Sequence, residues 1–479
     1  MLAVKTFKGA SWLILSRFAG RAIDMVTMLV LARILTPADF GTTALAMSLV
    51  AIVDTVLEVP VSQALTRLRE IDKTHLDTGF TLGVARSAIV ALAVLLVALP
   101  FWFFGANEHF LPLVLVLSAA PIARGLFSPG MVEYSRELSF RPMFVAEFTG
   151  KLAAFAAAMA TVFAGGGFWA IAVNFVVAPA IASAISYVLS PYKPSLSLSR
   201  FSHFSSFVGW FTATQVVSAL NWQFDRALIG VTADKATLGH YAVASDLSAA
   251  PTQSLIGPAL QPVMAAFAKI NADPPRLSRA FLKAARVAML LAVPAALGIA
   301  LTADLLVAIL LGPKWTETVP LMQWLALAVL PIPYFQTLCA LSMAVDRPSL
   351  MARLSIIDLG FRIVLVSLGV FLASAAGAGI ARLVLSGIMF AFYLDATYRL
   401  IGVGLVEQLK NLWKLLVAAA VMTAAVLLLR ERLVPLALQP VLEFVVTAGL
   451  AAATYACTLL ILGIRLMAGP SRLELVDRW

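Results

Sequence analysis

Three charged residues lie along one side of a long apolar segment near the start of the chain. The segment runs from Ser11 to Gly41 and contains Arg17, Arg21 and Asp24. Their spacings of four and three residues place all three on one stripe of a helix. Two interpretations follow: an internal ion pair that fixes helix packing, or the wall of a cavity that binds an anion. Arg226, in a later apolar segment, is a further candidate for anion binding.

Two acids in the next apolar segment form a second candidate site. Asp54 and Glu58 are four residues apart, so a helix brings two like charges together. They repel each other unless a cation, a proton or a neighbouring arginine lies between them. Arg17 or Arg21 are the simplest partners, and a coupling site for a proton or Na⁺ is the alternative.

Other charged residues in apolar segments have a simpler interpretation. Glu147 and Lys151 are four residues apart, as are Asp358 and Arg362, which is the spacing of an ion pair within one helix. Arg124 lies near a segment end, where its side chain can extend to the membrane surface. The sequence contains no GxxxxGK[ST], HExxH, CxxC or GxSxG motif. We therefore expect neither an enzyme nor a metal or cofactor site.

The composition places these residues in a membrane protein. Of 479 residues, 61% are hydrophobic and 13% are charged, and the mean hydropathy is +0.94. Soluble domains have about 45–50% apolar and about 25% charged residues. Because lipid offers no partner for free backbone groups, short connections between apolar spans predict an all-α helix bundle.

Hydropathy predicts about fourteen transmembrane helices. The spans lie near 11–33, 41–66, 79–104, 110–130, 143–164, 167–190, 207–231, 239–265, 284–310, 319–345, 350–373, 377–400, 411–429 and 440–464. With the N-terminus in the cytoplasm, 21 of the 35 Lys and Arg residues fall in cytoplasmic segments and 5 on the outer side. This distribution follows the positive-inside rule and predicts that both termini are cytoplasmic. It also explains the net charge of +10 without nucleic-acid binding.

The chain also repeats itself at an offset of 198 residues. Trp12 matches Trp210, Gly41 matches Gly239, Pro60 matches Pro258 and Gln63 matches Gln261. An offset of six helices preserves orientation, so the two halves are predicted to be parallel repeats. We expect an N-lobe of helices 1–6 (residues 1–200), a C-lobe of helices 7–12 (201–402), and helices 13–14 with a cytoplasmic tail (403–479). The substrate path would lie between the lobes, and Pro60 and Pro258 would kink equivalent helices.

Several segments together resemble a known family of transporters. They are VLARILTPADFGTTALA (30–46), YSRELSFRPM (134–143), VMAAFAKINADPPRL (263–277) and LGPKWTETVPLMQWL (311–325). Their order and spacing resemble the Wzx-like polysaccharide flippases of the MOP superfamily, in particular the colanic-acid and succinoglycan exporter types. The likeness is strongest from residue 5 to about 330.

The resemblance implies a flippase in the bacterial inner membrane that moves a polyprenyl-diphosphate-linked oligosaccharide. Membrane lipids and a polysaccharide polymerase or export complex are the implied partners. Relatives that flip cell-wall precursors place basic residues of the first helix in the cavity, and that role falls to Arg17 and Arg21 here. Asp24 departs from this pattern because it weakens the positive field. Two alternatives remain open: a multidrug or cation antiporter of the same superfamily, and a scaffold of an envelope-assembly complex that transports nothing.

Overall fold

The computed structural model describes residues 2–59, 61–67, 70–103, 109–137, 139–190, 192–433, 439–468 and 473–477. Helices dominate these residues, which confirms the predicted all-α membrane protein. After the last helix, strands β1 (Ile464–Ala468) and β2 (Leu473–Asp477) pair as an antiparallel hairpin. The sequence analysis did not predict this hairpin.

Long apolar helices recur along the described part of the chain. Nine of them can span a membrane, or ten if the bent pair Phe110–Gly125 and Pro129–Arg136 is one span. This number takes α16 (Ser349–Ile401) as one helix, although non-helical backbone at Ala373 and Ser374 divides it. The number fourteen stays a prediction.

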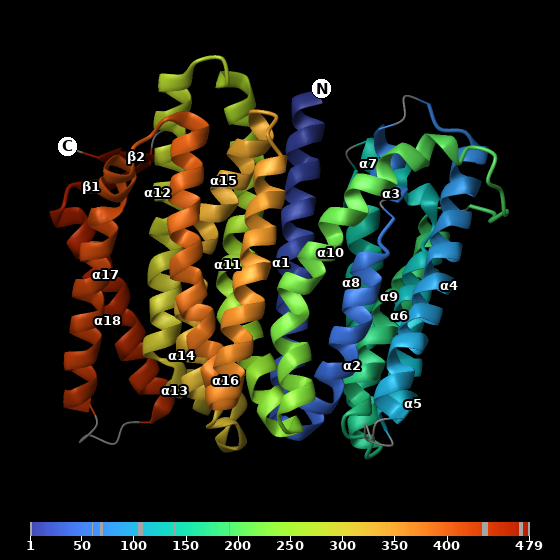
Figure 1. Ribbon diagram of the computed structural model, residues 1–479, viewed down its shortest axis with the longest axis horizontal. Coiled ribbons are helices and arrows are strands. Elements are labelled where there is room, and N and C mark those ends of the chain that lie inside the picture. The colour runs from blue at the N-terminus through green and yellow to red at the C-terminus, as the bar shows by residue number, and fades with distance from the viewer. Residues whose placement is uncertain are drawn as a thin grey trace. The chain divides into compact units, whose positions relative to one another are not determined.

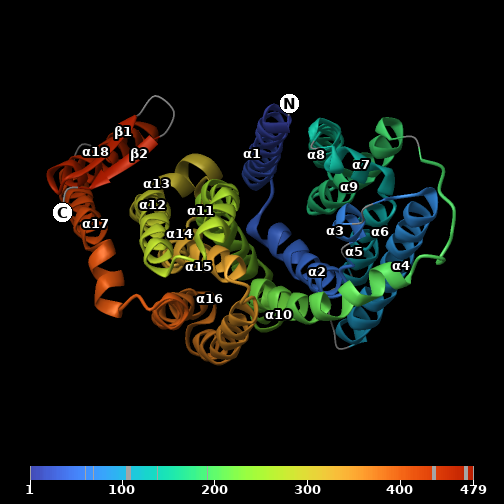
Figure 2. The same ribbon diagram turned by 90° about the horizontal axis from the view of Figure 1, so that it is seen from above.

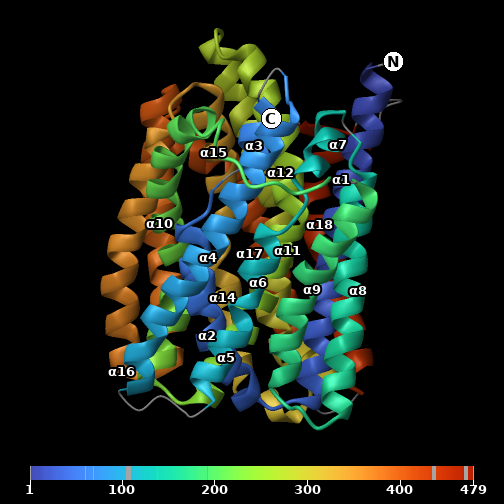
Figure 3. The ribbon, with the colours of Figure 1, turned by 90° about the vertical axis from the view of Figure 1, so that its right-hand side faces the viewer.

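The chain forms two compact units, residues 1–242 and 243–479. The first contains α1 (Leu2–Ile34), α2 (Pro37–Val56), α3 (Val61–Arg67), α4 (Lys73–Phe103), α5 (Phe110–Leu117), α6 (Ala119–Gly125), α7 (Val132–Arg136), α8 (Arg141–Phe163), α9 (Trp169–Leu189) and α10 (Ser202–Thr232) (Figures 1 and 3). Helix α11 (Lys235–Ile270) begins in the first unit and continues in the second. The predicted lobes, 1–200 and 201–402, stay a prediction.

Within the first unit, α8 pairs with α9, α1 packs on α8, and α2 packs on α10 (Figure 2). Fully buried apolar side chains from α2, α4 and α5, such as Val50, Val90 and Leu113, fill the space between these helices. The apolar core of this unit is divided among several clusters. Such a division leaves room for polar groups between the helices.

The first turns of α2 and α11 show the repeat directly. In α2, Thr36 Oγ1 accepts from the Asp39 backbone N–H, and Asp39 Oδ2 accepts from the Thr36 N–H. At the positions 198 residues later, Asp234 Oδ1 accepts from the Thr237 N–H at 2.8 Å. The two residue types are exchanged, but each helix begins with a side chain that caps the same turn. The hydrogen bond from the Thr237 N–H also lowers the pKa of the Asp234 carboxyl.

Matching glycines bring these two helices into backbone contact. A Cβ added to Gly41 would lie 1.6 Å from Lys235 O, and one added to Gly239 would lie 1.9 Å from Pro37 O. Lys235 follows Pro37 by 198 residues, as Gly239 follows Gly41. Each glycine therefore meets the equivalent carbonyl of the other helix, which is the pattern of a contact about a two-fold axis. The equivalent helices differ further along: α2 ends at Val56, whereas α11 is helical through residue 258. The predicted kink at Pro60 lies outside the described residues.

The second unit is built around one large apolar core. Its further elements are α12 (Pro274–Leu301), α13 (Ala303–Leu306), a π-helical turn (Val307–Leu311), a 3₁₀ turn (Pro313–Trp315), α14 (Thr318–Ala328), α15 (Ile332–Ala344), α16, α17 (Leu405–Leu433) and α18 (Pro440–Ile461). Helices α12 and α17 run parallel. Asn411 Nδ2 donates to Leu282 O, and Arg430 Nη1 donates to Leu301 O, both across 129 residues. Residues of α12, α15, α16, α17 and α18 supply most of the core.

Candidate functional site

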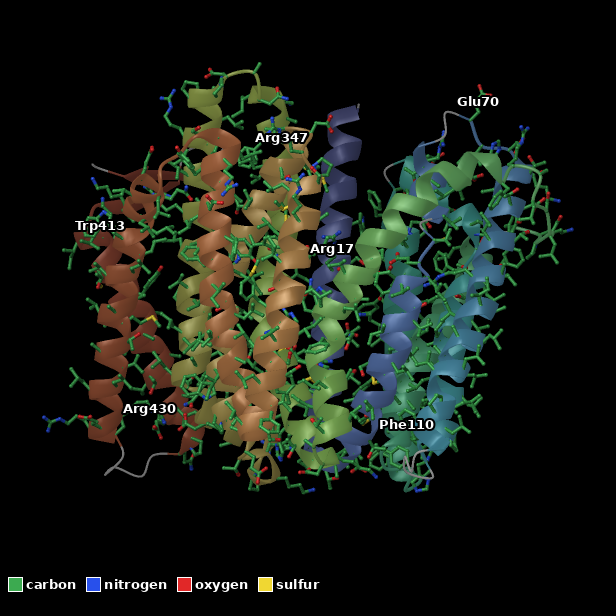
Figure 4. The ribbon with its side chains drawn as sticks, viewed as in Figure 1. Arg17, Glu70, Phe110, Arg347, Trp413 and Arg430 are labelled. Atoms are coloured by element: carbon green, nitrogen blue, oxygen red, sulfur yellow. The ribbon has the colours of Figure 1, made fainter. Side chains whose placement is uncertain are left out.

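Arg17 and Arg21 lie in the middle part of α1 with exposed side chains, and Figure 4 labels Arg17. Neither has an acidic partner within 4.0 Å among the described residues. An arginine at membrane depth normally faces the protein interior or water and pairs with a counter-ion. Glu147 of α8 (Arg141–Phe163) interacts electrostatically with Arg17. Because no described acid bonds directly to either arginine, both retain N–H donors for an anion that is not part of the chain.

The acid on the same helix is neutralised from another helix. Lys151 Nζ of α8 lies 2.5 Å from Asp24 Oδ2 and also donates to Gly20 O at 3.1 Å. The expected internal pair of Arg21 with Asp24 is therefore wrong, because Lys151 takes the carboxylate. The expected pairing of Lys151 with Glu147 is also replaced, since Glu147 accepts from Ser16 Oγ at 3.3 Å. Helix α8 thus neutralises Asp24 through Lys151, and it also places the Glu147 carboxyl within electrostatic range of Arg17.

Asp54 lies near the end of α2 and is held by arginines of other helices. Arg86 Nη2 of α4 donates to Asp54 Oδ1 at 2.6 Å and to Asp54 O at 2.5 Å. Its Nε donates to Leu57 O at 2.9 Å. Carbonyls at a helix C-terminus have no partner within the helix, so Arg86 also caps the end of α2. The expectation that Arg17 or Arg21 pairs with Asp54 is wrong.

A second arginine shares the Asp54 carboxylate. Arg124 Nη2 of α6 lies 3.3 Å from Asp54 Oδ2, and its guanidinium carbon is 5.5 Å from the centre of the Phe175 ring on α9. Glu58 lies in the non-helical segment after α2, and its Oε2 accepts from Gln215 Nε2 of α10 at 2.7 Å. The two acids of the sequence pattern therefore have different partners, one cationic and one neutral.

Arg226 joins two neighbouring helices of the first unit. It is half-buried on α10, and its Nη2 donates to Ala242 O of α11 at 3.4 Å. The adjacent Asp225 is buried and accepts from Tyr241 Oη at 3.1 Å. The contacts of Arg226 thus hold the start of α11, and its role in anion binding stays a prediction.

The sequence pattern missed Arg86, Lys151 and Gln215 as partners. All three lie in the apolar spans, but their partners are separated from them by 32, 127 and 157 residues. A single sequence carries no signal for pairing over such separations. The intrahelical pair that it did predict, Asp358 with Arg362, is present at 2.8 Å.

The second unit contains an apolar groove of 370 Å³. Met289 and Val293 of α12, Phe390 of α16, and Leu412 and Leu416 of α17 contribute to its lining, which is almost free of polar atoms. A groove of this composition suits a hydrocarbon chain and offers nothing to a charged group.

A sequence profile of a family described as polysaccharide biosynthesis proteins matches residues 30–320. The chain belongs to this family. Two relatives support the assignment over longer stretches. The lipopolysaccharide biosynthesis protein WzxC of Escherichia coli (strain K12) is 24% identical over 384 residues, 78% of this chain and 77% of the relative. The succinoglycan biosynthesis transport protein ExoT of Rhizobium meliloti (strain 1021) is 23% identical over 327 residues, 67% of this chain and 65% of the relative.

Solved structures show the fold of this family member. The lipid II flippase MurJ in an inward closed conformation superposes with a TM-score of 0.73 at 14% identity, over 95% of this chain and 98% of MurJ. An inward-facing multidrug resistance transporter of the MATE family has a TM-score of 0.62 at 13% identity, over 83% of this chain and 98% of the transporter. Relatives and solved structures alike are named as transport or biosynthesis proteins, which agrees with the expectation that this family member is a membrane transporter rather than an enzyme. Among the described residues, no group of acids, histidines and cysteines is arranged to hold a metal ion.

Proposed function

We propose that this protein is a flippase that moves a polyprenyl-diphosphate-linked oligosaccharide across the bacterial inner membrane during exopolysaccharide or O-antigen-type polysaccharide synthesis. Its family and the named functions of WzxC, ExoT and MurJ support this assignment. The observation that carries it is the pair Arg17 and Arg21, exposed in the middle part of α1 and without acidic partners among the described residues.

The charge of these arginines fits the cargo. A diphosphate crosses hydrocarbon poorly, so its path must supply cations. Arginine offers a planar group that binds phosphate oxygens through two parallel hydrogen bonds. Lys151 neutralises Asp24, so the positive charge of α1 remains available to the diphosphate.

The lipid part of the cargo needs a different surface. A prenyl chain can remain in the membrane or against apolar side chains while the headgroup moves, and the groove lined by Met289, Val293 and Leu412 has that character. Movement by alternating access, with rocking of two repeats, is the mechanism we infer for a parallel-repeat transporter.

Glu58 is the better candidate for a coupling proton. Asp54 is bonded to Arg86 and lies beside Arg124, so its partners are cations. Glu58 accepts from the neutral amide of Gln215, so its bonded partner carries no charge. The distribution of Lys and Arg supports cytoplasmic positions for both termini. A polymerase or export complex is the partner that this role requires.

The same contacts argue against a cation antiporter. Such a cavity needs acids that are free to bind a cation. Asp24 and Asp54 are bonded to Lys151 and Arg86, so of the three candidate acids only Glu58 has a neutral partner. A scaffold without transport would have no use for two arginines at membrane depth that have no directly bonded acid among the described residues, because such arginines are costly to insert.

Transport by the purified full chain in proteoliposomes tests the assignment. We expect a fluorescent polyprenyl-diphosphate-linked oligosaccharide to become accessible to a quencher on the opposite side, and a lipophilic cation dye not to move. Movement of the dye alone would establish the antiporter. Movement of neither would favour the scaffold, provided that the protein inserts and keeps its melting temperature.

A further inference from the structure

The two arginines on Asp54 have different surroundings. The Arg86 side chain is 14% exposed and donates to three acceptors, namely Asp54 Oδ1, Asp54 O and Leu57 O. The Arg124 side chain is 44% exposed, and its contact with Asp54 is 3.3 Å long. A guanidinium carries five N–H donors. Among the described residues, Arg86 makes three hydrogen bonds, whereas Arg124 has one contact of 3.3 Å with Asp54 and so retains more free donors. Arg86 therefore has a structural role, which Arg124 does not share.

The exposed part of Arg124 lies away from the lipid side of α6. Ile122 and Leu126 are exposed at 39% and 42% and share one face of this helix, as their four-residue spacing requires. Arg124 is midway between them in sequence and therefore projects from the opposite face, where it meets Asp54 of α2 and Phe175 of α9. An arginine on an interior face at membrane depth is expected to border water.

Phe175 fixes the orientation of the free donors. The guanidinium carbon of Arg124 lies 5.5 Å from the centre of its ring, within the range of a cation–π interaction. An aromatic ring beside a planar guanidinium restricts its tilt, and the N–H groups at the edge keep the geometry that binds two oxygens of one anion.

The charge of the cluster depends on Glu58. Arg86 and Arg124 supply two positive charges, and Asp54 and Glu58 supply two negative charges when both are ionised. Glu58 is held by the neutral amide of Gln215, so replacing its carboxylate with an amide removes one negative charge and breaks no bond to a cation. Loss of that charge leaves the cluster with an excess of one positive charge, which favours an anion at Arg124.

We propose that Arg124 is an anion-binding residue of the transport pathway, which contacts an acidic group of the cargo and is tuned by the charge of Glu58. This inference rests on the proposed function and adds to it a site that is separate from Arg17 and Arg21. The acidic group is either a phosphate of the carrier or a carboxylate of the oligosaccharide, and both present paired oxygens to the guanidinium edge.

Binding of two probes to the purified full chain tests the proposal and separates the two sources. The probes are a short polyprenyl diphosphate without sugar, and an acidic oligosaccharide without lipid. We expect Arg124→Ala to weaken one probe about tenfold, the effect of one charge-assisted hydrogen bond. Arg124→Lys should recover part of that loss. Glu58→Gln should shift the affinity in the opposite direction and strengthen binding of the same probe.

Arg399→Ala is the matched control, because Arg399 is 74% exposed and pairs with Asp395 within one helix. Unchanged affinity for both probes in Arg124→Ala would overturn the proposal, as would weaker binding in Glu58→Gln. A lower melting temperature with unchanged affinity would assign Arg124 a structural role instead. None of these results bears on the proposed function, which is judged by transport of the wild-type chain in proteoliposomes.

Discussion

The two compact units use charge in different ways. In the first unit, ion pairs join different helices: Asp24 of α1 with Lys151 of α8, and Asp54 of α2 with Arg86 of α4. In the second unit, the pair Asp358 with Arg362 lies within α16, and the interhelical pairs of Arg430 (α17) with Asp304 (α13) and Glu443 (α18) lie at helix ends. An ion pair between helices ties the charge state of a site to helix packing, whereas a pair within one helix does not.

The apolar cores of the two units also differ, since the core of the first unit is divided among several clusters. One large core cluster dominates the second unit, and some of its buried polar groups bond to one another. Tyr334 Oη donates to Gln408 Oε1 at 2.5 Å, and Gln408 Nε2 donates to Leu394 O and Val403 O. This unit contributes rigidity and an apolar groove, whereas the first unit contributes the groups that can bind a charged cargo.

The largest effect on transport is expected from changes at Arg17 and Arg21. Arg17→Ala or Arg21→Ala should lower transport about ten- to a hundredfold, since each removes charge-assisted hydrogen bonds to the diphosphate. The Lys variants should retain part of the activity, because a point charge replaces a planar fork. Flipping in proteoliposomes is the measurement. Asp24 keeps Lys151 in these variants, so the melting temperature should not change. A lower melting temperature would give Arg17 and Arg21 a structural role.

Arg86 should show the opposite behaviour, with a large loss of stability. Arg86→Ala leaves Asp54 without its closest cation and two carbonyls near the α2 end without a donor, at a cost of about 3–5 kcal/mol. Thermal unfolding in detergent measures the loss. The double variant Arg86→Met with Asp54→Leu should recover much of the stability. If Arg86→Ala is as stable as the wild type, the first unit does not depend on its interhelical ion pairs.

The sequence predicted the class of fold better than the contacts of the site. Hydropathy and the 198-residue offset follow from the local order of residues, and they correctly indicated a helical membrane protein in which Gly41 and Gly239 are equivalent. The pair Asp358 with Arg362 could also be predicted, because helix geometry fixes which residues meet at a spacing of four.

The partners of Asp24, Asp54 and Glu58 could not be predicted in this way. Each lies on another helix, and which helix faces which depends on tertiary packing rather than on spacing. The interpretation of Arg124 as a residue that extends to the membrane surface shows the same limit. Its position near the end of the predicted span suggested the membrane surface. Its contacts with Asp54 and Phe175 instead place it on an interior face.

The glycine contact of α2 and α11 tests whether the repeat matters for stability. Gly41→Ala and Gly239→Ala each place a Cβ against backbone of the other helix, and overpacking of this kind costs about 1–3 kcal/mol. Because the contact is reciprocal, we expect equal losses, and a double variant that loses less than the sum. Gly298→Ala is the control, since nothing lies within 4 Å of its added Cβ. Clearly unequal losses, measured by thermal unfolding, would contradict a symmetric contact.

The smallest effect is expected from the ion pair between α1 and α8, and it separates packing from cargo binding most directly. The Asp24 and Lys151 side chains are 51% and 27% exposed, so water screens the pair and its coupling free energy should be about 1 kcal/mol or less. Single and double alanine variants, compared by thermal unfolding, give that value.

Transport should respond differently from stability. Lys151→Ala frees the Asp24 carboxylate to oppose the field of Arg17 and Arg21, so transport should fall. Adding Asp24→Ala removes that carboxylate and should restore transport. If the double variant transports no better than Lys151→Ala, then Lys151 does not act by shielding the arginines of α1 from Asp24.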